Sequence, residues 1–357
     1  MIFMKSHRSV IIGASGKRAN HHALAYKYVK RASLVAVSAR TAVPRDQLAA
    51  EYGISKCYND YQEMLYKEKP DLVHIVTNPS FRLEILKAVD DAKIPAAIIE
   101  KPIAIDTDDC LELGMFAQNC KTKIVVNHQL HYHQPRMRLM QLVTEGAIGK
   151  INLIDASCCM NAASQGTHTI QGVLAFAGLS RTPSSLFAQA TGTKGLFQDS
   201  KNHLAPDDLL IHMSFQDGLR ATLSCGNGAP FLVAAPVESQ SAPWAHKRIS
   251  VFGDYGHIEW TMWSWKTLIK GVLEKGSHDY WVEDAAAEAR LVESIFDLLE
   301  GNLSNHPLSL VNSIKEYLLL LTAYQSVIQQ DRQNFPTSLQ SNLIRSLRRH
   351  LDNSCTV

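Results

Sequence analysis

The sequence predicts an α/β protein of two domains. The first is a parallel sheet covered by helices on both faces, and the second is an α+β domain built on an open, mostly antiparallel sheet. The first third of the chain alternates short, nearly continuous apolar runs with amphipathic segments, as parallel strands and their covering helices do. After about residue 127 this alternation gives way to strand pairs joined by turns. With 357 residues the chain is long enough for two cores.

Five strands are predicted in the first domain, each an apolar run of four to six residues. They are Ser9–Ile12, Ser33–Val37, Asp71–Val76, Ala96–Ile99 and Lys123–Val126. The segments between them have helical periodicity, which predicts helices over Asn20–Lys30, Arg45–Tyr52, Tyr61–Tyr66, Phe81–Ala92 and Asp108–Asn119. Parallel sheets bind ligands at the carboxyl ends of their strands, so the residues that follow each strand are the candidates for a site.

Two hairpins mark the second domain. Gln216-Asp217-Gly218 separates the strand Leu209–Phe215 from Arg220–Ser224, and Gly253–Gly256 separates Arg248–Phe252 from His257–Trp260. Helices return at Ala285–Leu299 and Leu310–Gln330. The predicted boundaries are therefore 1–126 for the first domain, 127–336 for the second and 337–357 for a basic amphipathic tail. We expect this tail to be solvated or to contact a subunit, with membrane attachment as the less favoured alternative.

Composition limits the partners and the compartment. Lys and Arg total 36 and Asp and Glu 34, a net charge of +2 that gives no reason to expect nucleic acid or an anionic membrane. Seven cysteines, an odd number without a CxxC pair, fit reduced thiols better than a disulfide framework. No segment has the layout of a signal peptide or a membrane span. We therefore expect a cytoplasmic protein.

A glycine turn follows the first strand. In Gly13-Ala14-Ser15-Gly16-Lys17-Arg18, glycine lets the backbone approach a pyrophosphate, and the start of the next helix adds positive potential. The turn departs from GxGxxG at Ser15 and Arg18, and an ordinary strand–helix turn is the alternative. Its place after the first strand favours a dinucleotide site formed by Gly13, Ser15, Gly16, Lys17 and Arg18.

The end of the second strand bears on the choice of cofactor. NAD-binding sheets usually carry an acid there for the ribose 2′-hydroxyl, whereas this chain has Ser38, Arg40 and Thr41. A guanidinium pairs well with a phosphate. The pattern thus favours NADP over NAD by a small margin.

A Glu-Lys-Pro turn, residues 100–102, follows the fourth strand and completes a recognisable pattern. The segment Asp71–Asp106, with its Thr77-Asn78-Pro79 turn, resembles the glucose–fructose oxidoreductase and inositol dehydrogenase (Gfo/Idh/MocA) family. The resemblance extends over about residues 8–336. It includes Asn127–Tyr132 before Pro135, Glu145–Ile151, the GxH pattern at Gly166 and His168, and the later sheet strands.

This resemblance implies a Rossmann domain, a C-terminal domain with an open sheet, and hydride transfer between a nicotinamide and a secondary alcohol or ketone of a sugar, glycoside or cyclitol. It implies that Lys101 and His168 are catalytic, and that the Lys101–Pro102 bond can be cis, as in many relatives. A histidine can remove the alcohol proton near neutral pH, and a lysine ammonium can stabilise the developing alkoxide. It further implies a homodimer or homotetramer formed through the C-terminal sheet. Residues expected on the nicotinamide side are Thr77, Asn78, Pro79, Glu100 and Lys101, and those expected to face the substrate are Gln129, His131, Tyr132, Ser164, Gln165 and His168.

Three positions depart from the family pattern. In the DxGxHxxD signature both acids are replaced, by Ser164 and by Gln171, and His131 stands where many relatives have Arg. These changes leave two alternatives open: a non-catalytic NADP-binding regulatory protein, and a redox-assisted glycoside-cleaving enzyme that recycles NAD(H). We expect no metal at His128, His131 and His133, because no acid or thiol completes that set nearby.

Overall fold

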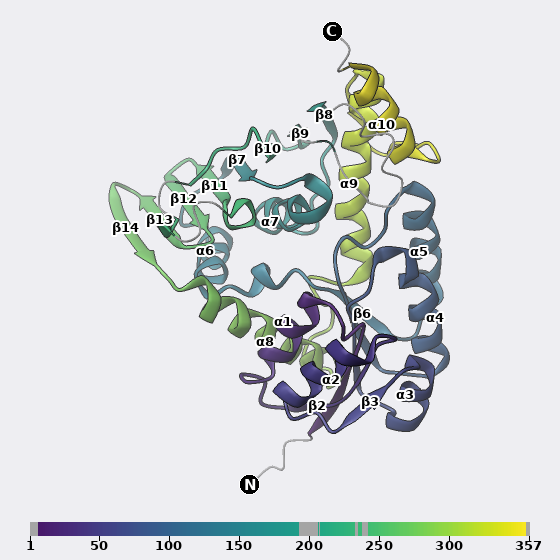
Figure 1. The fold of residues 1–357 in the computed structure, drawn as a ribbon. Helices are drawn as coiled ribbons and strands as arrows, with labels where there is room; N and C mark the ends of the chain where they lie inside the picture. The colour runs from purple at the N-terminus through teal and green to yellow at the C-terminus, as the bar shows by residue number, and fades with distance from the viewer. Residues whose placement is uncertain (1–5, 193–205, 207, 233–234, 238–241, 355–357) are drawn as a thin grey trace. The chain divides into compact units, whose positions relative to one another are not determined.

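The computed structural model describes residues 6–192, 206, 208–232, 235–237 and 242–354. The chain forms two compact units (Figure 1). One comprises Met1–Ala104, Leu111–Tyr132 and Trp281–Ile314, and the other Ile105–Cys110, His133–Tyr280 and Lys315–Val357. Residues 1–5 of the predicted first domain and 355–357 of the predicted tail, with Cys355, lie outside the described residues. The six described cysteines are free thiols.

A six-stranded sheet forms the centre of the first unit, and all its neighbouring strands are parallel, as predicted. The strand order is β3-β2-β1-β4-β5-β6, so the winding reverses between β1 and β4, where such sheets bind ligands. The strands are β1 (His7–Ile12), β2 (Ala32–Ser38), β3 (Lys56–Tyr58), β4 (Leu72–Ile75), β5 (Ala96–Ile99) and β6 (Lys123–Val126). The sequence does not predict β3, because three residues carry too little periodicity.

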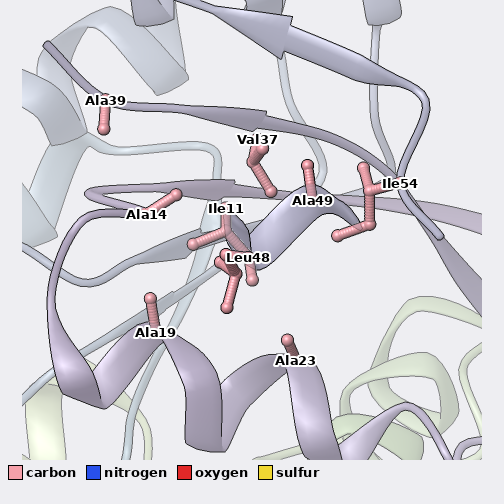
Figure 2. Packing of buried hydrophobic residues seen from close by; sticks show 9 residues of the cluster. All are labelled: Ile11, Ala14, Ala19, Ala23, Val37, Ala39, Leu48, Ala49 and Ile54. Atoms are coloured by element: carbon pink, nitrogen blue, oxygen red, sulfur yellow. The ribbon is translucent and has the colours of Figure 1, made fainter. Parts of the chain in front are cut away.

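The helices between these strands lie close to their predicted positions, except that the first runs over Lys17–Ala25 and not over Asn20–Lys30. They are α1 (Lys17–Ala25), α2 (Ala42–Glu51), α3 (Tyr61–Glu68), α4 (Arg82–Asp91) and α5 (Thr107–Asn119). Figure 2 shows Ala19 and Ala23 of α1 facing Ile11 of β1 and Leu48 of α2 in one buried cluster. Because alanine side chains are short, α1 packs close to the sheet, and the turn before it is held against the strand ends.

Residues 281–314 belong to the first unit, although the sequence predicts a second domain that runs from 127 to 336. Four residues of helix α8 (Tyr280–Leu299), which are Leu291, Val292, Ile295 and Phe296, pack in a buried cluster with side chains of β4, β5 and β6. The chain then pairs with β6, since the amide of Val126 donates to the carbonyl of Leu308 at 2.9 Å. An apolar face predicts that a helix is buried, but it does not indicate which sheet the helix packs against. The sequence therefore assigns α8 to the same domain as the segments next to it in the chain.

A nine-stranded sheet forms the second unit, in the order β14-β13-β12-β11-β7-β10-β9-β8-β15. Only the pair β7–β10 is parallel, so the predicted mostly antiparallel sheet is confirmed. Both predicted hairpins form, as β9–β10 and β11–β12. The strands are β7 (Ile151–Cys158), β8 (Ser185–Thr191), β9 (Asp208–Ser214), β10 (Arg220–Gly226), β11 (Lys247–Gly253), β12 (Gly256–Thr261), β13 (Ser264–Ile269), β14 (Val272–Ser277) and β15 (Gln333–Asn334).

Helices α6 (Gln134–Thr144) and α7 (Thr167–Ala177) pack on this sheet, α7 against β7 and β11 and α6 against β12 and β13. Helix α9 (Leu310–Gln329) precedes the tail helix α10 (Leu343–Ser354). The apolar residues Leu343, Leu347 and Leu351 of α10 are buried, whereas the sequence predicts a tail that is solvated or contacts a subunit. Among the described helices, none has the length and apolar character needed to cross a membrane.

The packing of α8 predicts a large cost for removing Leu291, which is fully buried against the first sheet. Leu291→Ala should lower the free energy of unfolding by about 2–5 kcal/mol, because it removes buried methyl groups and leaves a cavity. Leu111→Ala, at a half-exposed position of α5, should change it by about 0.5 kcal/mol or less. Urea unfolding of the whole chain measures both, and equal costs would show that α8 does not hold the first unit together.

Candidate functional site

The turn after β1 has a shape that only glycine permits. Gly13 has φ +91°, and a Cβ built there would lie 2.4 Å from the carbonyl oxygen of Val76. The amides of Gly13 and Ala14 both donate to the carbonyl of Ser38, at 2.9 and 3.1 Å. The turn is thus fixed against the carboxyl ends of β2 and β4.

The second glycine leaves open space at the start of α1. Gly16 occupies the N-cap with φ −95° and no side-chain hydrogen bond, and no other described atom lies within 4 Å of a Cβ built there. Ser15, Gly16 and Lys17 are exposed. The first turn of a helix carries unpaired amides and positive potential, so this end is suited to an anion.

The end of β2 carries one exposed cation. Ser38 is buried, whereas Arg40 and Thr41 are exposed. The Arg40 guanidinium lies 5.9 Å from the ring centroid of Phe81, which follows the turn after β4. The predicted adenosine-side residue therefore stands beside an aromatic ring at the same edge of the sheet.

Arg82 holds the turns after β4 and β5 together. Its buried guanidinium donates to the carbonyl of Thr77 at 2.8 Å and to the carbonyl of Pro102. In the first turn, Asn78 accepts from the amide of Ser80 at 3.1 Å, and Pro79 begins a short 3₁₀ turn. In the second, the Lys101–Pro102 bond is cis, as predicted.

Glu100 is held through one of its two oxygens. Oε1 accepts from Arg18 Nε at 2.7 Å, from His22 Nε2 at 2.9 Å and from Asn127 Nδ2 at 2.9 Å. Arg18 and the hydrogen bond from His22 hold the pKa of this carboxyl well below its usual range, although burial acts in the opposite direction. No hydrogen bond to Oε2 is found among the described residues. Glu100 therefore stays ionised and keeps a free acceptor.

The Arg18 side chain is directed to Glu100, and its Nη2 lies 3.3 Å from Glu288 Oε2. The sequence places Arg18 in the pyrophosphate turn. Its backbone belongs to that turn, but its guanidinium is paired with two acids. The sequence gives no signal for Glu288, which belongs to no nucleotide-binding motif. Asn127 begins the segment Asn127–Tyr132 that resembles the family, but nothing in the sequence predicts its contact with Glu100.

In the second unit, His168 is buried in the first turn of α7. A π-helical turn, Ala162–Gly166, leads into that helix, and the side chain of Asn161 accepts from the amide of Ser164 at 2.9 Å. A Cβ on Gly166 would lie 2.8 Å from Cys225 Sγ, so this turn sits directly on the sheet. Ser164 and Gln165 are half-buried beside it.

Gln171, at the second departed acid position, points into the core. Its Oε1 accepts from Arg136 Nη2 at 2.8 Å, and the Arg136 guanidinium lies between the rings of Phe176 and Trp260, at 6.0 and 5.5 Å. Burial lowers the pKa of Arg136 to about 9. In this chain the position partners a buried arginine.

The segment after β6 also carries predicted substrate residues. Gln129 is buried and donates to Asp284 Oδ1 at 3.1 Å, and Tyr132 Oη lies 3.2 Å from His306 Nε2. The ring of His131 packs edge-on against Tyr132, at 5.2 Å between centroids. The described residues include no group of His, Cys, Asp and Glu suited to a metal ion.

A dinucleotide fits the first unit on three observations. The amides at the start of α1 are open over Gly16, which suits a pyrophosphate. Glu100 Oε2 is an ionised acceptor at the carboxyl end of β5, which suits a ribose hydroxyl. The hydroxyl of Thr77 is buried without a hydrogen-bond partner among the described residues, which leaves a polar atom for a ligand to satisfy. The fold and these features define a Rossmann-type nucleotide-binding protein.

Comparison with known proteins then gives a family match. Residues 7–128 match the Gfo/Idh/MocA family profile, which is described as "Oxidoreductase family, NAD-binding Rossmann fold". Among curated proteins, a 1-carboxy-3-chloro-3,4-dihydroxycyclohexa-1,5-diene dehydrogenase of Comamonas testosteroni is 23% identical over 125 residues, 35% of this chain and 31% of the relative. The match thus spans about a third of that relative's length.

Solved structures share the two-unit fold over nearly the whole chain. An oxidoreductase from Agrobacterium radiobacter in complex with NAD+, L-tartaric acid and magnesium matches with a TM-score of 0.77 at 17% identity, over 92% of this chain and 98% of that one. A levoglucosan dehydrogenase in complex with NADH and levoglucosan gives 0.76 at 14% identity, over 93% and 100%. An apo scyllo-inositol dehydrogenase from Lactobacillus casei gives 0.72 at 17%, over 94% and 99%.

The two glycines of the turn predict opposite effects of adding a methyl group. Gly16→Ala should leave the unfolding midpoint nearly unchanged and weaken NADH binding by roughly tenfold or more, since the methyl group would occupy the space that a pyrophosphate needs. Gly13→Ala should lower the midpoint itself, because of its positive φ and the clash with Val76. Thermal unfolding and NADH fluorescence titration measure both. Unchanged NADH affinity in Gly16→Ala would place the pyrophosphate elsewhere.

Proposed function

We propose that this protein is an NAD(P)-dependent oxidoreductase that transfers a hydride between a nicotinamide and a secondary alcohol or ketone of a sugar, glycoside or cyclitol. One observation carries the proposal: the open start of α1 and the Glu100-Lys101 turn lie at the same edge of one parallel sheet, which is where Rossmann domains bind dinucleotides. The family-profile match over residues 7–128 and the structural likeness to a levoglucosan dehydrogenase and a scyllo-inositol dehydrogenase support it.

Glu100 has the chemistry to hold the nicotinamide ribose. Three donors fix Oε1, so the carboxylate cannot rotate freely, and Oε2 stays an acceptor for a hydroxyl. The next residue, Lys101, is then held beside the ribose by the backbone.

Lys101 and His168 perform the proton chemistry in this proposal. When bound, the dinucleotide supplies the hydride acceptor or donor. His168 removes the hydroxyl proton as the alcohol is oxidised, and the Lys101 ammonium stabilises the negative charge that develops on that oxygen. With Ser164 in place of the family's acid, the hydroxyl is met by a neutral side chain, and Lys101 is the charged group that acts on it.

We propose NADP(H) as the preferred cofactor. The end of β2 has no acid for a ribose 2′-hydroxyl, and Arg40 is exposed there beside Phe81. A guanidinium can pair with a 2′-phosphate and stack on an aromatic plane at the same time.

Arg40→Ala should weaken NADPH binding by roughly tenfold or more, because it removes a charge-assisted hydrogen bond worth about 1.5–3 kcal/mol. NADH binding should change little, so it is the internal control. Arg40→Lys should retain part of the preference for NADPH, since a lysine keeps the positive charge but cannot donate two parallel hydrogen bonds as a guanidinium does. Nicotinamide fluorescence titration measures all six affinities, those of the wild type and both variants for NADPH and NADH. Equal affinities of the wild type for NADH and NADPH would remove the proposed preference.

The catalytic pair is tested on a panel of sugars and cyclitols with NADP+ and NAD+, followed by absorbance of the reduced nicotinamide. On a confirmed substrate, His168→Asn and Lys101→Met should each lower kcat by about 10²–10⁴-fold while leaving dinucleotide affinity within a few-fold of wild type. Full turnover by His168→Asn would exclude it as the base. If aglycone is released without net nicotinamide reduction, the glycoside-cleaving alternative replaces the dehydrogenase.

A further inference from the structure

A second buried carboxylate lies beside Glu100. Glu288 of α8 is 1% exposed, and its Oε1 lies 2.8 Å from His22 Nδ1 and 3.1 Å from Asn127 Nδ2. Its Oε2 lies 3.3 Å from Arg18 Nη2. Arg18, His22 and Asn127 are also the three donors to Glu100. The two acids therefore share one set of donors from α1 and from the end of β6.

The charges of this cluster balance when His22 is protonated. Among the groups in direct contact, two carboxylates face one guanidinium, which leaves one negative charge. Farther out, the buried Asp284 acts on Arg18 and the Lys101 ammonium acts on Glu100, with opposite signs. Burial alone lowers the pKa of His22, but Glu288 and Glu100 outweigh it and raise this pKa to about 9. The imidazolium then supplies the second positive charge: its Nε2 donates to Glu100 Oε1, and its Nδ1 lies 2.8 Å from Glu288 Oε1.

A second histidine agrees with this proton count. His74 Nδ1 lies 2.9 Å from His22 Nδ1, and two such atoms form a hydrogen bond when one of them carries the proton. Burial and the charge of His22 hold the pKa of His74 well below its usual value, so His74 is neutral. Its Nε2 lies 2.8 Å from Tyr26 Oη. His74 Nδ1 is therefore an acceptor for the one proton on His22 Nδ1, a proton that Glu288 Oε1 also faces.

We propose that Glu288 is a positioning residue for the Lys101 turn. With His22 and Arg18 it completes a cluster of two acids and two bases that fixes Glu100, and the backbone transmits that position to Lys101. Without Glu288, Glu100 would be the one acid in contact with both Arg18 and His22 among the described residues, and a buried positive charge would lose its nearest compensation. The inference rests on the proposed function and deepens it. Glu288 lies outside every nucleotide-binding motif, and we assign to it the role of holding the turn that carries Lys101.

The first test needs no dinucleotide. Glu288→Gln keeps the shape of the side chain and removes its charge. Glu293→Gln is the matched control, because Glu293 lies on the same helix but pairs with Arg31, at 2.6 Å. In protein labelled at histidine and lysine, NMR titration follows His22 and Lys101, assigned through His22→Asn and Lys101→Arg. In Glu288→Gln the pKa of His22 should fall from about 9 to below neutral pH, and the Lys101 resonances should shift. Neither should change in Glu293→Gln.

A double-mutant cycle covers the case in which Glu288→Gln unfolds. Glu288→Gln combined with His22→Asn removes one charge of each sign, so Arg18 and Glu100 still balance. The double variant should therefore have a higher unfolding midpoint in urea than the sum of the two single effects allows. Simple additivity would overturn the inference, as would unchanged His22 and Lys101 signals in folded Glu288→Gln.

NADH titration separates this inference from the proposed function. Glu288→Gln should bind NADH roughly tenfold more weakly than wild type and Glu293→Gln. Equal NADH affinity in wild type and Glu288→Gln would overturn the positioning role. If the wild type binds neither NADH nor NADPH while the His22 and Lys101 signals move as expected, the oxidoreductase proposal fails and the role of Glu288 in holding the turn stands.

Discussion

The first unit depends on one carboxylate, Glu100, placed where four elements converge. Its Oε1 accepts hydrogen bonds from α1 and from the end of β6, and the same donors connect it to α8. A buried carboxylate is costly unless its charge is compensated, so the surrounding cations and amides are required for the fold as well as for the site. The same requirement fixes the turn that carries Lys101, so the position of that residue follows from how the buried charges are compensated.

The two units surround their buried charges differently. In the first, acids and bases lie in direct contact. In the second, Arg136 lies near two aromatic rings and is hydrogen-bonded by the neutral amide of Gln171, and burial lowers its pKa although the buried Glu316 acts in the opposite direction. Gln171 therefore accounts for one departure from the family signature, since its side chain is engaged in the core of the second unit. Ser164, at the other departed position, stays half-buried at the turn that leads to His168.

Local pattern was enough to predict most of the fold. The five longer strands of the first sheet, both hairpins and the glycine turn follow from apolar runs and from conformations that only glycine adopts, as at Gly13. The Lys101–Pro102 turn was found through resemblance. Contacts between distant segments could not be predicted from the sequence. Glu288 lies 188 residues after Glu100 in the chain, and the pattern of an amphipathic helix does not indicate which residue a polar side chain contacts. Arg18 shows the same limit, because its position in the turn predicts a ligand contact and its side chain instead meets two acids.

The return of residues 281–314 to the first unit has a consequence for synthesis on the ribosome. After about 130 residues have emerged, all six strands of the parallel sheet exist. The apolar face formed by Leu72, Ile98 and Val125 then lacks Leu291, Val292, Ile295 and Phe296, which cover it once α8 is made. During that interval the nascent first unit exposes apolar surface, which favours binding by chaperones. For the same reason, a fragment that ends at Tyr132 should not fold as an independent unit. A fragment designed to contain the first unit must also include α8.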